Sequence, residues 1–155
     1  MSNKLKLQVV MTLAALVAVG LCIYSFSLTK LAWQEYDNAR LVAFARQIDS
    51  ADHIVATCKF GSVNLIIAGE DAKRVVRAVS LSRSHRPPSG SKWKIYYSVK
   101  AAFLRGTNVL GDIEICSHVF LIYHDQSPFQ DDTGLLKAIV YEPTFDAYFK
   151  EREGK

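Results

Sequence analysis

The sequence is poor in cysteine and contains none of the short motifs that mark common catalytic or cofactor sites. It has three cysteines in 155 residues and no CxxC pair, which argues against a structural zinc site. A GxSxG turn, a P-loop, an HExxH helix and a GxGxxG loop are also missing. We therefore expect a non-enzymatic protein that uses no metal and no cofactor.

Acidic side chains are absent from one long stretch. Residues 72–111 carry nine Lys or Arg residues and no Asp or Glu, whereas residues 112–155 carry four bases and nine acids. Basic and acidic elements that pack side by side and neutralise each other would explain this segregation. The alternative is a basic surface that binds an acidic protein or an anionic envelope component. The candidate residues for that surface are Lys73, Arg74, Arg77, Arg83, Arg86 and Lys92.

The longest hydrophobic run stands near the start of the chain. Residues 7–28 contain no charged side chain, and as a helix they would extend about 33 Å, enough to cross a hydrocarbon core of about 30 Å. The run is longer than the apolar core of most secretory signals, so we interpret it as a retained signal anchor in the lipid bilayer. A signal that is cleaved to release a secreted protein is the alternative.

The charges around this run predict its orientation. Lys4 and Lys6 lie in a short basic segment, residues 1–6, whereas Lys30 is the only base soon after the run. The positive-inside tendency then places the N-terminus in the cytoplasm and the following domain outside it. The chain is predicted to be a single-pass membrane protein.

The residues after the run suit one domain of mixed structure. We expect a membrane-proximal helix at residues 29–49 and an α+β domain at residues 50–155. Hairpin-length turns and too few crossovers favour a small antiparallel sheet of four to five strands, with helices packed mainly on one face. Alternating apolar residues predict strands at residues 53–60, 62–68, 93–104, 109–116 and 119–124.

Within the domain, helices are predicted in three places. Ala72, Val75, Val76 and Val79 fall at i, i+3, i+4 and i+7, the apolar stripe of an amphipathic helix over residues 70–80. Shorter helical segments are expected at residues 134–141 and from Pro143 to about Arg152. The segments 81–92 and 125–132 are expected as loops.

The basic stretch also contains aromatic residues, a combination found on surfaces that bind nucleic acid. Trp93 and Tyr97, however, fall on the apolar face of their predicted strand, where we expect them to be part of the core. Of these aromatic residues, Tyr96 alone lies on the same strand face as Lys94 and Lys100. The extracytoplasmic location also argues against nucleic acid as a partner.

Two cysteines, Cys58 and Cys116, fall in the predicted domain. Outside the cytoplasm they could form one disulfide. The alternative is two buried thiols that pack as small apolar side chains.

A small thiol- or metal-dependent enzyme around Cys58, Cys116 and His118 is the rival hypothesis. Asp112, Glu114, Cys116 and His118 would share one face of an unbroken strand, but over about 20 Å, so that one metal could reach only the last two. A nucleophilic thiol needs a histidine within hydrogen-bond reach, and sequence spacing supplies no evidence of one. We favour a membrane-anchored binding or accessory domain, with a structural subunit of a membrane complex as a third hypothesis.

Overall fold

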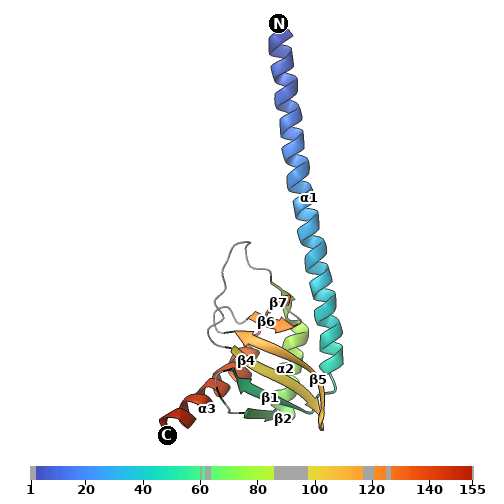
Figure 1. Cartoon of the computed structure of the whole chain (residues 1–155). Helices are drawn as coiled ribbons and strands as arrows, with labels where there is room; N and C mark the ends of the chain where they lie inside the picture. Colours follow the sequence, from blue (N-terminus) through green and yellow to red (C-terminus); the bar gives the residue numbers. More distant parts are fainter. Residues whose placement is uncertain are drawn as a thin grey trace. The chain divides into compact units, whose positions relative to one another are not determined.

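The computed structural model describes residues 3–59, 61, 64–85, 98–116, 121–124 and 127–154 (Figure 1). The described elements follow one another in the order α1, β1, β2, α2, β3, β4, β5, β6, β7, η1 and α3. The chain divides into two compact units, residues 1–36 and residues 37–155.

The first element is a long apolar helix, α1 (Asn3–Ile48). In the described part of the chain it alone is long and apolar enough to cross a membrane, although a signal sequence near the N-terminus passes the same test. Its large apolar side chains from Val9 to Leu28 are exposed, unlike those of a core helix. The run that we interpreted as a membrane span is therefore helical, and α1 continues without a break through the expected membrane-proximal segment.

The second unit is built on one antiparallel sheet in the order β2-β1-β4-β5-β6-β7-β3. The strands are β1 (His53–Cys58), β2 (Asn64–Ala68), β3 (Arg83–Ser84), β4 (Ser98–Arg105), β5 (Asn108–Cys116), β6 (Leu121–His124) and β7 (Ser127–Gln130). β1 pairs antiparallel with β2, and β4 with β5, which agrees with the hairpin-length turns between these strands.

The number of strands corrects our expectation of four to five. Seven described strands form the sheet, and the two unexpected ones, β3 and β7, have two and four residues. They lie where we expected loops. Segments as short as β3 and β7 show too little alternation of apolar and polar residues to be recognised as strands from the sequence. Each becomes a strand because a partner strand lies beside it.

Three further helical segments complete the α+β fold. They are α2 (Gly69–Leu81), the π-helical segment η1 (Leu136–Tyr141) and α3 (Glu142–Glu153). In α2 the predicted stripe of Ala72, Val75, Val76 and Val79 is buried. Glu70 and Asp71 occupy its first turn, where the helix dipole favours negative charge.

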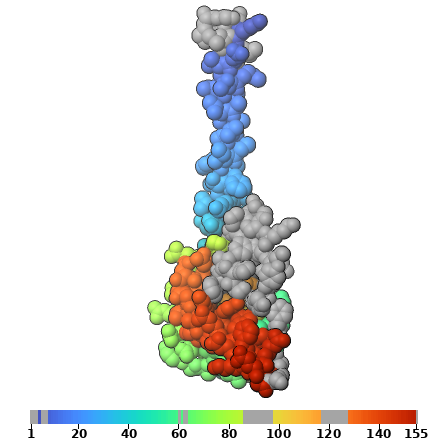
Figure 2. Space-filling view, turned by 90° about the vertical axis from the view of Figure 1, so that its left-hand side faces the viewer, coloured from blue at the N-terminus to red at the C-terminus, as the bar shows by residue number. Residues whose placement is uncertain are grey.

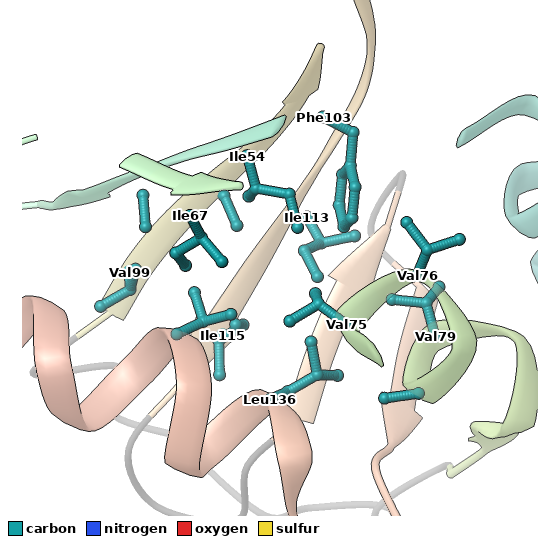
Figure 3. Close-up of a cluster of buried hydrophobic side chains, with 14 of the residues drawn as sticks. Ile54, Ile67, Val75, Val76, Val79, Val99, Phe103, Ile113, Ile115 and Leu136 are labelled. Atoms are coloured by element: carbon teal, nitrogen blue, oxygen red, sulfur yellow. The ribbon is translucent and has the colours of Figure 1, made fainter. Parts of the chain in front are cut away.

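The core lies between the sheet and these helices (Figure 3). Alternate strand residues such as Ile54, Phe103 and Ile113 face Val75 of α2 and Leu136 of η1, and all five are almost completely buried. Each such side chain stabilises the fold by about 1.5–3 kcal/mol relative to its exposed state. The α+β class, with helices packed on one sheet face, is confirmed.

The end of α1 also belongs to this core. Leu41, Phe44 and Ile48 are buried, and the ring of Phe44 packs edge to face on that of Phe103. The side-chain amide of Gln47 donates a hydrogen bond to the carbonyl of Leu110. The last turns of α1, which fall in the predicted membrane-proximal helix at residues 29–49, therefore pack into the folded domain.

The two edges of the sheet differ in kind. On one edge, β3 contributes two residues, Arg83 and Ser84. On the other, β2 is a five-residue apolar strand, and Ile66 at its centre is 68% exposed. No described strand pairs with the outer side of β2.

Candidate functional site

The structure describes four of the six basic residues that we proposed as one surface, and they lie on two different elements. Lys73, Arg74 and Arg77 lie on α2, and Arg83 lies in β3 rather than in a loop. Lys73 and Arg77 line a groove toward the end of α1, whereas Arg74 lines a hollow toward η1 and α3. Arg86 and Lys92 lie outside the described residues.

Three of these bases have an acidic side chain within 4 Å, and one of the three is Lys73, whose neighbour is Glu70. A guanidinium nitrogen of Arg74 donates to the carboxylate of Asp71 at 3.1 Å, and the Nε of Arg83 lies 3.8 Å from a carboxylate oxygen of Asp132. For these positions the structure favours the simpler interpretation, in which bases and acids offset one another on the surface.

The groove between the end of α1 and α2 has a volume of about 720 Å³. Its walls combine apolar and charged side chains: Val42, Ala45, Arg46, Asp49, Ala51, Lys73, Val76, Arg77 and Ser80. It is the best candidate site in the described part of the chain because it brings three basic side chains together over an apolar floor.

Helical spacing explains why these residues face the groove. On α1, the buried side chains of Leu41, Phe44 and Ile48 turn another face outward, with Val42, Arg46 and Asp49 at i, i+4 and i+7. On α2, burial of Val75 and Val79 leaves a second row facing the groove. That row is Lys73, Val76, Arg77 and Ser80.

The charges in the groove are only weakly neutralised. Among the residues that the structure describes, neither Arg46 nor Arg77 has an ion-pair partner. Lys73 Nζ lies 3.8 Å from Glu70, but both side chains are about three-quarters exposed, and an exposed pair of this kind contributes little. Asp49 is the single acid among the described residues of the lining, and these residues together carry a net positive charge.

Sequence reasoning missed Arg46. It stands in the first part of the chain, where bases and acids balance, so charge counting gave it no weight. Its position four residues after the exposed Val42 was the available signal, but a groove between two helices separated by the β1–β2 hairpin depends on tertiary packing.

The opposite face of the sheet carries the acidic alternation that we singled out. Asp112, Glu114 and Cys116 share this face in β5. Asp112 pairs with Lys100 at 2.8 Å, and this hydrogen bond and its charge raise the pKa of Lys100. Glu114 accepts a hydrogen bond from Ser98 and lies 3.7 Å from Lys59. These acids are used in cross-strand pairs.

The cysteines are separate buried thiols. Cys58 lies in the core, whereas Cys116 lies on the opposite sheet face, and β4 runs between their strands. Strands with one strand between them lie about 9.5 Å apart, which exceeds the distance between the two Cα atoms of a disulfide. Both thiols are free. The proposed disulfide between Cys58 and Cys116 is therefore not formed in this structure.

Burial also lowers the reactivity of Cys116. It raises the pKa of the thiol to about 12, and the negative charge of Glu114 adds to the rise. A thiol that stays protonated is a poor nucleophile and a poor metal ligand. No group of three His, Cys, Asp or Glu residues that could hold a metal occurs among the described residues, and His118 lies outside them.

Comparison with protein families, curated proteins and solved structures finds no match to this chain.

Proposed function

We propose that the protein is a membrane-anchored, non-enzymatic binding domain whose groove between α1 and α2 takes an acidic, amphipathic segment of a protein. The observation that carries the proposal is the pair Arg46 and Arg77, which flank an apolar floor without acidic partners among the described residues. An acidic segment would supply carboxylates to the two guanidinium groups, which bind carboxylates in planar, two-pronged geometry.

The apolar floor favours a peptide over a free anion. Val42 is 47% exposed in the groove wall, and Ala45 and Val76 extend the apolar surface. A helix that carries apolar side chains on one face and acids beside them matches this lining, in the manner of helix-in-groove recognition.

Attachment to the membrane is the second part of the proposal. We propose that residues 7–28 stay in the bilayer, with the N-terminus in the cytoplasm and the domain outside. The apolar helix and the bases Lys4 and Lys6 before it support this arrangement. Full-length protein should then stay with membranes through alkaline extraction, and recovery of a soluble protein without its first twenty or so residues would show cleavage instead.

Binding is tested with full-length protein in detergent and a short labelled peptide whose helix has a Leu face and a Glu face. We expect saturable binding that weakens with salt, because exposed charges are screened over about 8–10 Å at ordinary ionic strength. Reversal of both arginines, Arg46→Glu with Arg77→Glu, should abolish binding while the protein stays folded.

Two controls make this test specific. Arg83→Glu removes a base that already pairs with Asp132 away from the groove lining, so peptide binding should not change. A peptide with Lys in place of Glu should not bind. Equal binding of the two peptides, or unchanged binding by the double arginine variant, would contradict the proposal.

A further inference from the structure

An acidic stripe runs along the exposed side of α3. Glu142, Asp146, Phe149 and Glu153 fall at i, i+4, i+7 and i+11, so that they share one helix face, and all four are exposed. The Phe149 side chain is 51% exposed. We call these four residues the α3 ridge. The C-terminal segment, red in Figure 2, lies at the surface of the domain.

Other charges lie close to the α3 ridge. Lys137 approaches Glu142 at 3.4 Å, and Lys150 is an exposed neighbour of Phe149 on the helix. Arg152 donates to the hydroxyl of Tyr148 at 3.2 Å and lies over that ring. Asp146 and Glu153, on either side of Phe149, remain the ridge carboxylates without an ion pair among the described residues.

The α3 ridge has the features that the groove requires of its occupant. It presents an exposed aromatic ring between carboxylates, and the groove presents an apolar floor between Arg46, Lys73 and Arg77. The match in charge follows the segregation of the sequence, in which the basic stretch precedes an acidic C-terminal part. Complementary potentials of this kind steer association and fix its register.

Within one copy the ridge is kept from the groove by α2. One side of α2 lines the groove through Lys73 and Arg77, and its other side lines a hollow with Ala138, Ile139 and Pro143 of η1 and α3. The ridge can therefore reach a groove only on another chain.

We propose that the occupant of the groove is the α3 ridge of a second copy of this chain. The proposal rests on the function proposed above and names its partner. Because the contact joins two different surfaces, two copies related by a two-fold axis would exchange ridges in a closed dimer, and any other arrangement would continue from copy to copy into a ring or an open array. Anchorage in one bilayer would raise the effective concentration of the two surfaces.

The test uses differently tagged, full-length chains in detergent and measures their association by sedimentation. The groove variant is Arg46→Glu with Arg77→Glu, and the ridge variant is Asp146→Lys with Glu153→Lys. Wild-type protein should form oligomers that dissociate at raised salt. Each variant alone should associate at least about tenfold more weakly, because like charges then meet across the contact.

Mixing the two variants gives the decisive result. The intact ridge of the groove variant fits the intact groove of the ridge variant, and the reversed ridge fits the reversed groove. The mixture should therefore associate as wild-type protein does, although neither variant does so alone. A chain that carries all four reversals should associate with itself again. Arg83→Glu is the matched control, and circular dichroism shows that each variant is folded.

Three outcomes would overturn the proposal: monomeric wild-type protein at all concentrations, association of the ridge variant equal to that of wild type, or no association in the mixture. If the groove still binds the Leu–Glu peptide in those cases, the proposed function stands with a different acidic partner. If the double arginine variant also leaves peptide binding unchanged, both proposals fail.

Discussion

Phe44, at the end of the long N-terminal helix, packs edge to face against Phe103 in the centre of the sheet, with ring centroids 6.0 Å apart. Both rings are almost completely buried. An aromatic pair in this geometry contributes about 0.5–1.5 kcal/mol beyond its buried area. Through this contact the last turns of α1 contribute to the stability of the domain.

Phe44→Ala should therefore destabilise the domain by about 3–5 kcal/mol, through lost burial and the cavity that remains. Phe149→Ala removes the same side chain from a half-exposed position and should cost much less. Chemical denaturation of full-length protein in detergent measures both changes. Equal losses for the two variants would show that α1 does not pack on the sheet as described.

Gly111 is required by the same ring. A Cβ at this position would stand 2.6 Å from Cε2 of Phe44, so Gly111→Ala should destabilise the domain by about 1–3 kcal/mol through overpacking. Phe44→Leu in the same chain should recover part of that loss. A double-mutant cycle measures the coupling, and additive effects would mean that the two residues are not in contact.

The fold could be predicted where a local pattern decided the structure. In α2, Val75 and Val79 sit at helical spacing, and in β1 apolar residues alternate over a full strand; both patterns need no knowledge of neighbours. The strands β3 and β7 are too short for such a signal, so that only pairing defines them. The burial of Val76 was also predicted. The sequence pattern did not predict that Val76 would lie in the floor of a groove.

The candidate site was predicted only in part. Charge counting found Lys73 and Arg77 because they stand in a stretch without acids. It also grouped Arg74 and Arg83 with them, although their acidic partners lie beside them in the fold. The Arg83–Asp132 pair depends on tertiary packing, which a count along the chain does not contain. Asp71, in contrast, stands three residues before Arg74, so helical spacing could have predicted that pair.

Cys116 should resist alkylation in the folded protein. With its pKa raised to about 12 by burial, only about one thiol in ten thousand is ionised at pH 8. In a Cys22→Ser variant, N-ethylmaleimide should therefore not label Cys116 until the domain is unfolded, and Cys58 should be protected by its burial in the core. Rapid labelling of Cys116 at pH 8 in folded protein would revive the thiol-enzyme hypothesis.

Asp52 should contribute to the dependence of stability on pH. A hydrogen bond from the Gly106 N–H, at 2.8 Å, and the contact with His53 lower its pKa below the ordinary value of 3.8. A pKa that is lowered in the folded state stabilises the protein at pH values above the ordinary pKa of the group. This stabilisation is lost as the pH falls through the lowered pKa.

Wild-type protein should thus exceed Asp52→Asn in stability near neutral pH, and the difference should shrink as the pH falls below 3.8. Denaturation curves of both proteins across this range give the comparison. A constant difference at all pH values would assign the effect to packing and not to the charge of Asp52.

The unequal edges of the sheet have a consequence for the behaviour of the protein in concentrated solution. In the described part of the chain no strand pairs with the outer side of β2 at Ile66, and β2 contains no proline or charged side chain that would block a further strand. It is the place where intermolecular sheet growth should begin when the protein is concentrated or warmed. Ile66→Lys should delay the onset of light scattering and leave the unfolding midpoint unchanged, whereas a charge at the equally exposed Val109 of β5 should not slow aggregation.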